Sequence, residues 1–257
     1  MAEVSCRAHH SGWSAEEPLR RSAVVLVRSG LFRRRVEGTE SVVDSMSAYF
    51  QRLGSVQQVA HPRGGDTCTV IVPSPDAIGG LADSGACFPD AAMVVSPRVD
   101  VDHRALVARA RQGAEEFELT ERATVLAGRL IGALNGELSR LAQPQNGARG
   151  RWLTDQVRQA LAGDIDLSLL ELARRIGVSP FHLSRTFRSV TGMTLTRYRR
   201  QLRLKGALDR LESGASDLAG LAAELGFADQ AHFTRTMRAE AGATPGQLRA
   251  LLGTPGK

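Results

Sequence analysis

The stretch "GFADQAHFTRTMRAEAG", residues 226–242, repeats a pattern that also occurs as "GVSPFHLSRTFRSVTG", residues 177–192. Each copy begins and ends with glycine, and Arg185 and Arg235 hold equivalent places in the two copies. A glycine can end one helix in a left-handed conformation, and a polar residue just after it can cap the next. The repeat therefore predicts two helix-turn-helix motifs, in which the second helix enters the major groove of DNA.

The residues before each copy carry the signals of a preceding helix. Ser168 is followed three residues later by Glu171, which is the pattern of a capping box. An apolar stripe at helical spacing precedes both copies, as Leu169, Leu172, Ala173 and Ile176 and as Leu218, Leu221, Ala222 and Leu225. The predicted recognition helices are residues 179–191 and 229–241.

A long helix is expected between the two motifs, over residues 195–214. About eighteen helical residues span about 27 Å. Successive major grooves on one face of B-DNA lie about 34 Å apart. The two recognition helices are therefore expected to read successive major grooves, which lengthens the DNA site without the need for a dimer.

The net positive charge of the chain belongs to the same part. Residues 151–257 contain 16 Lys and Arg against 10 Asp and Glu, while residues 1–150 contain 17 of each. The net charge of +6 therefore belongs to the C-terminal part, which indicates a polyanionic partner. Residues 151–257 alone are expected to bind DNA with a strong salt dependence.

The N-terminal part has a different pattern. Short runs rich in Val and Ile recur between Ala23 and Ser96, bounded by Gly, Pro or Ser, and they predict antiparallel strands of a sandwich or barrel. Helical periodicity follows, and "QPQNGARG" at residues 143–150 has the composition of a linker. The expected fold is α+β, with an N-terminal domain over 1–142 and an all-α DNA-binding domain over 151–257.

The C-terminal part resembles the DNA-binding domain of the AraC/XylS family of bacterial transcription regulators. The resemblance rests on "LLELARRIGVSPFHLSRTFRSVTGMTLTRYRRQLRL" and "LAGLAAELGFADQAHFTRTMRAEAGATPGQLR". The family's pattern for the second motif is matched by Gly226, Phe227, Asp229, His232, Phe233, Arg235, Gly242, Pro245 and Arg249. Met237 stands where the family usually has Phe, and no loss of function is expected because Met packs adaptably.

The resemblance implies a sequence-specific regulator of transcription that binds double-stranded DNA through the exposed side of each recognition helix. In the first helix the implied base-facing residues are Phe181, His182, Ser184, Arg185 and Arg188. In the second they are Gln230, Ala231, Thr234, Arg235 and Arg238. Arg185 and Arg235 are the main candidates for guanine edges, and the alternative for each is a phosphate contact or a solvated helix face.

The N-terminal strands resemble, less closely, the cupin-type sensor domain of AraC-like regulators. This resemblance implies a small-molecule effector, whose binding residues the sequence does not identify. A metal cupin needs an H-x-H pair, whereas His61 stands alone and His9–His10 precede the first strand, so neither a metal nor another cofactor is expected. "RGGD" at residues 63–66 indicates a hairpin turn rather than a phosphate loop.

The alternative function is a DNA-binding protein with an enzymatic N-terminal domain of the DNA-repair or cupin type. A DNA-repair enzyme of this kind would need a nucleophilic cysteine. Cys6, Cys68 and Cys87 are odd in number and form no C-x-x-C pair, which argues against a disulfide framework or a zinc site. A catalytic pair of Cys68 and His61 stays open at this point, although buried cysteines are usually inert. No catalytic residue is therefore assigned, and the chain is expected not to be an enzyme.

The remaining expectations concern a homodimer, RNA polymerase and the location of the protein in the cell. A leucine stripe favours a homodimer through residues 119–141, with packing on the chain's own β-domain as the alternative. An activator would also contact RNA polymerase. No run of eighteen apolar residues and no secretory signal occur, so a cytoplasmic, nucleoid-associated protein is expected.

Overall fold

The computed structural model describes residues 1–7, 11–73, 92–141 and 147–253. For residues 134–141 it describes the helical backbone and not the side chains. His9–His10, Cys87 and residues 143–146, the first half of the predicted linker, lie outside the described residues.

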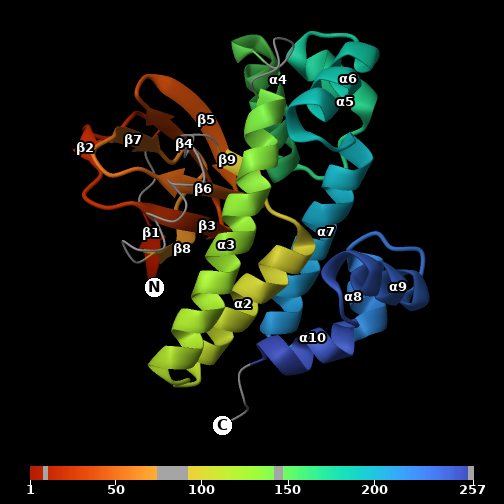
Figure 1. Cartoon of the computed structure of the whole chain (residues 1–257). Helices are drawn as coiled ribbons and strands as arrows, with labels where there is room; N and C mark the ends of the chain where they lie inside the picture. Colours follow the sequence, from red (N-terminus) through yellow and green to blue (C-terminus); the bar gives the residue numbers. More distant parts are fainter. Residues whose placement is uncertain (8–10, 74–91, 142–146, 254–257) are drawn as a thin grey trace. The chain divides into compact units, whose positions relative to one another are not determined.

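The N-terminal strands form two antiparallel sheets (Figure 1). The five-stranded sheet has the order β1-β8-β3-β6-β9, and the four-stranded sheet has the order β2-β7-β4-β5. The strands are β1 Ala2–Cys6, β2 Glu17–Pro18, β3 Ala23–Ser29, β4 Leu31–Val36, β5 Thr39–Asp44, β6 Ser47–Gln51, β7 Val56–Ala60, β8 Asp66–Ile71 and β9 Ala92–Val94. Every pairing of these strands is antiparallel, which confirms the predicted class of the N-terminal fold.

Alternation along β4 places Arg34 on the sheet face opposite Arg33 and Arg35. Arg34 is buried at 1% exposure, and its guanidinium lies over the Tyr49 ring, 4.5 Å from the ring centroid. Arg33 and Arg35 face the other way, where each pairs with Glu40 and lies over the Trp13 ring. The sequence did not predict β1, β2 and β5. β1 has almost no buried residues of its own, and its pairing with β8 defines it as a strand.

The helices are α2 Pro97–Arg111, α3 Glu116–Leu141, α4 Ala148–Gly163, α5 Leu169–Ile176, α6 Pro180–Thr191, α7 Leu195–Glu212, α8 Leu218–Glu224, α9 Gln230–Ala241 and α10 Pro245–Leu252. The predicted recognition helices and the long helix between them are present as α6, α9 and α7. The sequence did not predict α4 or α10, and α4 begins inside the predicted linker. None of the described helices has a stretch long and apolar enough to cross a membrane.

The chain divides into two compact units, Met1–Val94 with Leu130–Arg197 and Val95–Arg129 with Tyr198–Lys257. The first unit contains both sheets, α4 and the α5–α6 motif, and the second contains α2 and the α8–α9 motif. Each unit therefore joins a segment of the N-terminal half to one helix-turn-helix. The boundaries proposed from sequence, 1–142 and 151–257, stay a prediction.

Part of the leucine stripe of α3 is already buried within the chain. Leu130 and Ile131 line a small cavity of the first unit together with Val24, Phe50 and Met93. Leu126 is buried in the second unit. The other leucines of the stripe, at 134, 138 and 141, lie outside the described side chains.

Candidate nucleic-acid interface

The first helix-turn-helix is held by caps at each turn. Ser168 and Glu171 form the predicted capping box at the start of α5, with the Ser168 hydroxyl accepting from the Glu171 N–H at 3.2 Å. Gly177 ends α5 with φ +78°, a left-handed conformation that favours glycine. Ser179 then caps α6 by accepting from the N–H of His182, and Pro180 occupies the first helical position.

The second motif reproduces this arrangement with different capping residues. Asp217 caps α8 by accepting from the backbone N–H groups of Ala219 and Gly220. Gly226 occupies the same left-handed place as its counterpart, with φ +71°. Asp229 caps α9 through the His232 N–H at 2.6 Å. Serine and aspartate accept the same hydrogen bond, so the two sequences specify one backbone path.

The buried sides of the two recognition helices anchor them in their motifs. Leu183 and Phe187 of α6, and Phe233 and Met237 of α9, are at most 1% exposed. Met237 fills the core position at which the family usually has Phe, as expected from its adaptable side chain. These contacts fix which face of each helix is turned outward.

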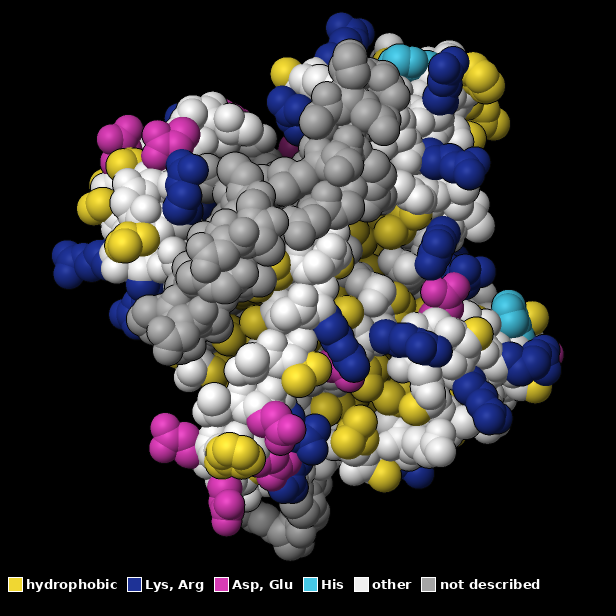
Figure 2. Space-filling view, viewed as in Figure 1, with side chains coloured by type: hydrophobic (Ala, Val, Ile, Leu, Met, Phe, Trp, Pro, Cys, Tyr) yellow, Lys and Arg dark blue, Asp and Glu magenta, His cyan; other side chains and the backbone are white. Residues whose placement is uncertain are grey.

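The ten residues predicted to face DNA lie on the outer sides of α6 and α9. Eight of them are exposed, and Ser184 and Thr234 are half-buried. Phe181 is 76% exposed, which is unusual for a large apolar side chain and suits contact with a base or a thymine methyl group. In Figure 2 separate basic side chains, in dark blue, lie on the outer surface of the α5–α6 region and on that of the α8–α9 region.

Most of the remaining residues in the second family motif have structural roles. The Phe227 ring contacts His232 edge-on and Phe233 at centroid distances of 5.5 and 5.1 Å. Arg249 of α10 donates to the carbonyl oxygens of Ala215 and Ser216, before α8. The motif therefore identifies the fold of this region, and the exposed residues between its fixed positions are left to determine DNA sequence preference.

Two arginines of α7 lie close to the second motif. Arg200 pairs with Glu240 of α9 at 2.5 Å. The guanidinium of Arg203 lies beside Gly226, where an added Cβ would be 3.3 Å from it. Both arginines thus help to position the second motif within its unit.

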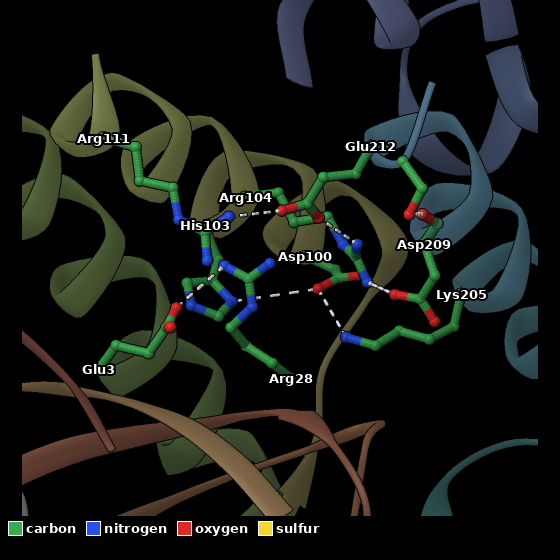
Figure 3. Close-up of polar contacts among 10 residues, drawn as sticks. Glu3, Arg28, Asp100, His103, Arg104, Arg111, Lys205, Asp209 and Glu212 are labelled. Carbon is green, nitrogen blue, oxygen red and sulfur yellow. Dashed lines mark hydrogen bonds and ion pairs between the residues drawn. The ribbon is translucent and has the colours of Figure 1, made fainter. Parts of the chain in front are cut away.

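An ionic network joins α2 to α7 and was missed by the sequence analysis. Arg104 pairs with Asp209 at 2.5 Å and with Glu212 at 2.7 Å, while Asp100 accepts from Lys205 at 2.9 Å (Figure 3). Arg104 is only 2% exposed, and it also pairs with Asp100 at 3.1 Å. Burial alone would raise the pKa of Asp100, but Lys205 and Arg104 hold that pKa down to about 2.

Apolar contacts reinforce this junction between α2 and the second motif. Val101 and Ala105 belong to the same hydrophobic core as Leu208, Phe233 and Met237. One turn of α2 therefore completes the core behind the recognition helix α9. The i, i+4 pair of Asp100 and Arg104 was visible in the sequence, but nothing there identified its partners about a hundred residues later.

A second junction, in the first unit, joins α4 to β5 of the four-stranded sheet and to β6 of the five-stranded sheet. Arg158 of α4 pairs with Asp44 at 3.3 Å and donates to the Val42 carbonyl at 3.0 Å and the Ser47 hydroxyl at 3.2 Å. Burial raises the pKa of Asp155 to about 7, although Arg158 and the Val42 N–H favour its charged form. Asp155 is therefore a carboxyl group that titrates near neutral pH at this junction.

Asp155 is expected to make the folded protein less stable as the pH rises. A raised pKa means that the folded state binds the proton more tightly than the unfolded state between about pH 4 and pH 7, so stability falls as pH rises through this window. Asp155→Asn should therefore gain about 2–3 kcal/mol relative to the wild type between pH 5 and pH 8. Urea unfolding at both pH values measures this, with Glu16→Gln, an exposed carboxylate, as control. Equal pH dependence of wild type and Asp155→Asn would contradict the assignment.

Inside the β-domain, the Cys68 thiol is not hydrogen-bonded to His61, its partner in the catalytic pair considered above. It donates to Oδ2 of Asp66 at 3.0 Å, while Nε2 of His61 lies 2.6 Å from Oδ1 of the same carboxylate. Asp66 thus stands between the thiol and the imidazole. Burial and this hydrogen bond raise the pKa of the Cys68 thiol, which disfavours the nucleophilic thiolate.

Comparisons with known proteins agree with this geometry. A family model described as a helix-turn-helix domain matches residues 172–250. The regulatory protein SoxS of Salmonella typhimurium is 34% identical over 98 residues, which are 38% of this chain and 86% of SoxS. The arabinose operon regulatory protein of Escherichia coli is 29% identical over 87 residues, which are 34% of this chain and 30% of that protein.

Among solved structures, ToxT from Vibrio cholerae aligns with 98% of this chain and 97% of its own, at 10% identity and a TM-score of 0.39. The family assignment rests instead on SoxS, most of whose length this chain matches, and on the two helix-turn-helix motifs described above. The chain therefore belongs to the AraC/XylS family of DNA-binding transcription regulators.

Proposed function

We propose that this regulator recognises a specific DNA site with α6 and α9, each entering one major groove, and that a small-molecule effector bound by the β-domain modulates this binding. The observation that carries the proposal is the repeat itself. Two separately capped helices expose an arginine pair at the same place, Arg185 with Arg188 and Arg235 with Arg238. Arginine reads a guanine edge with two parallel hydrogen bonds.

Substitution of Arg185 or Arg235 by alanine is expected to weaken binding by about 1–3 kcal/mol and to relax base preference at one subsite each. Both guanidinium groups are exposed, two residues after the buried Leu183 or Phe233, which turns them toward the groove side of the helix. Selection of bound sequences from a random DNA pool, carried out for each variant, measures the effect.

Arg175→Ala is the matched control, because Arg175 is an exposed arginine in the last turn of α5, outside the recognition helix. Its loss should weaken binding to all sequences alike, as expected for a phosphate contact. If Arg185→Ala and Arg235→Ala behave like this control, both residues are phosphate contacts, and base reading belongs to other residues of the two helices.

The effector response is supported by the way in which each motif is built into its unit. α2 contributes to the core and ion pairs of the second motif, and α4, which packs on α5 and α6, is bonded to β5 and β6. A ligand that shifts the β-domain or α2 has a direct physical route to DNA-binding elements. Thermal unfolding with candidate metabolites tests this part, since a bound ligand raises the melting temperature. If no ligand that raises it also changes DNA affinity, the effector proposal is wrong.

We also propose a homodimer through residues 119–141. If the protein is an activator, it also contacts RNA polymerase. Val125 and Phe117 of α3 are 51% and 80% exposed, which supports a partner on this helix, whereas Leu130 and Ile131 already pack within the chain. Sedimentation of the full chain at tens of micromolar is expected to show a dimer that Val125→Glu dissociates. A monomer at that concentration argues for internal packing alone.

An enzymatic N-terminal domain is the less supported alternative. Cys68 is buried, and its thiol is hydrogen-bonded to the Asp66 carboxylate rather than to the His61 imidazole. This arrangement does not favour a nucleophilic cysteine at this position.

A further inference from the structure

Four side chains with metal-binding chemistry meet at one end of the five-stranded sheet. Cys6 is the last residue of the edge strand β1, Asp66 and Cys68 lie on β8, and His61 follows the end of β7. In the β1–β8 register Cys6 is paired with Asp66. Paired residues, and residues two apart on a strand, face the same side of a sheet, so Cys6, Asp66 and Cys68 share one face.

The ligand atoms lie close enough together to share one ion. Sγ of Cys6, a ring nitrogen of His61 and a carboxylate oxygen of Asp66 are all within 4.8 Å of one another. A tetrahedral ion bound about 2.0–2.3 Å from each ligand needs ligand atoms roughly 3.3–3.8 Å apart. The imidazole and carboxylate are now closer than this, at 2.6 Å, because they share a hydrogen bond. Small side-chain rotations would open the group around an ion.

The group is largely buried, and its carboxylate is held by hydrogen bonds with His61 and Cys68. His61 and Asp66 are 4% and 9% exposed, and Cys68 is 5% exposed. A carboxylate in such surroundings is stable only when it is hydrogen-bonded or paired. The His61 ring is also packed on Phe32, with centroids 5.5 Å apart, so the imidazole is held in place. Cys6 is only half-buried, which leaves a route for an ion from solvent.

Two glycines allow the backbone segments to approach closely enough for the group to form. A Cβ atom on Gly65 would lie 1.8 Å from the carbonyl oxygen of Cys6. A Cβ atom on Gly30, whose φ is +90°, would lie 2.6 Å from the carbonyl oxygen of Gly65. Larger residues at either place would push β1, the turn before β8 and the β3–β4 turn apart. The close approach is thus specified by the sequence.

We propose that Cys6, His61 and Asp66 bind a divalent thiophilic cation, for which Zn²⁺ has the matching ligand preference. Thiolate, imidazole and carboxylate are the three ligand types of zinc sites, whereas Mg²⁺ and Ca²⁺ prefer oxygen alone. Water would complete the tetrahedral coordination of such an ion. Cys68 is a positioning residue that orients Asp66 through its hydrogen bond. Binding releases the Cys6 thiol proton to solvent and requires an unprotonated Nε2 on His61.

The site is independent of the proposed DNA reading and effector response, because none of its residues belongs to α6 or α9 and its test does not involve DNA. It also differs from the metal-cupin pattern that the sequence lacks. Its ligands come from β1, from the residue after β7 and from β8, and none of them stands in an H-x-H pair.

The test uses the full-length chain, reduced, stripped with a chelator and carrying no polyhistidine tag. Titration with Zn²⁺ in a calorimeter is expected to give one ion per chain, and Co²⁺ should give the near-ultraviolet absorption of a thiolate ligand. Cys6→Ser and His61→Gln should each lower Zn²⁺ affinity by more than about 100-fold, since loss of a hydrogen-bond partner of a ligand alone costs about 10- to 100-fold. Cys68→Ala should fall within that smaller range.

His182→Gln is the matched control, because it removes an exposed imidazole of α6 outside the proposed site, and it should bind Zn²⁺ as the wild type does. Cys6 is half-buried on an edge strand, so Cys6→Ser is the variant best suited to keep its fold, which circular dichroism checks. Absence of stoichiometric Zn²⁺ binding by the wild type overturns the proposal. Wild-type affinity in folded Cys6→Ser, or loss of binding in His182→Gln, overturns it equally.

Discussion

The affinity of the full-length protein for its DNA site is expected to fall by about 10³- to 10⁵-fold between 50 and 200 mM salt, the range for a protein that makes 6–10 phosphate contacts. The net charge of +6 lies within residues 151–257, and arginines are exposed on α5 and on both recognition helices. Each arginine that contacts a phosphate releases condensed counterions from DNA, so the loss follows the logarithm of salt concentration. Fluorescence anisotropy with a labelled duplex measures the slope.

Single variants sharpen this expectation. Arg175→Ala, at an exposed position of α5, should reduce the salt slope by about 1. Arg20→Ala removes an exposed arginine from the N-terminal half, whose charges balance, and should leave the slope unchanged. A flat salt dependence, or equal effects of the two variants, contradicts an electrostatic interface in the C-terminal helices. The full chain is the right material because α2 supplies Val101 and Ala105 to the core of the second motif.

Arg104→Met is expected to lower the free energy of unfolding by about 3–5 kcal/mol, the range for removing one partner of a buried ion pair. Arg104 is 2% exposed and pairs with Asp100, Asp209 and Glu212. Its loss leaves the buried carboxylate of Asp100 with Lys205 and removes the direct ion pairs from Arg104 to α7. Since this junction lies behind α9, DNA affinity should fall with stability.

Arg111→Met provides the comparison, because Arg111 pairs with the same Glu212 at 3.3 Å from a side chain that is 54% exposed. An exposed pair contributes about 0–1 kcal/mol, so this variant should unfold nearly as the wild type does. Urea unfolding followed by circular dichroism separates the two. Equal small losses would mean that α2 is not energetically coupled to α7.

Local patterns in the sequence were sufficient for the C-terminal motifs. The caps at Ser168, Ser179 and Asp229 and the glycines at 177 and 226 act within a few residues, so their effects can be deduced without knowledge of the fold. The same holds for the apolar stripes, which determine which side of each recognition helix is exposed. The antiparallel class of the N-terminal half also followed from the short, bounded runs of the sequence.

Elements without a local pattern were not predictable. The strand β1 is almost entirely exposed, and only its pairing with β8 defines it as a strand. The first three residues of α4 fall in a segment whose Gly and polar residues are typical of a linker, and α4 packs against α5, α6 and β5. In both cases contacts with distant residues override a weak local preference.

By itself, the sequence determined that this protein has two DNA-binding motifs, which surface of each faces outward, and that positive charge lies with them. Only the tertiary structure decided that Arg104 meets Asp209 and Glu212, and that Cys6 meets His61 and Asp66. The reason is physical. Caps and stripes are encoded over a few residues, whereas side chains far apart in the chain meet only after strand register and helix packing have been set.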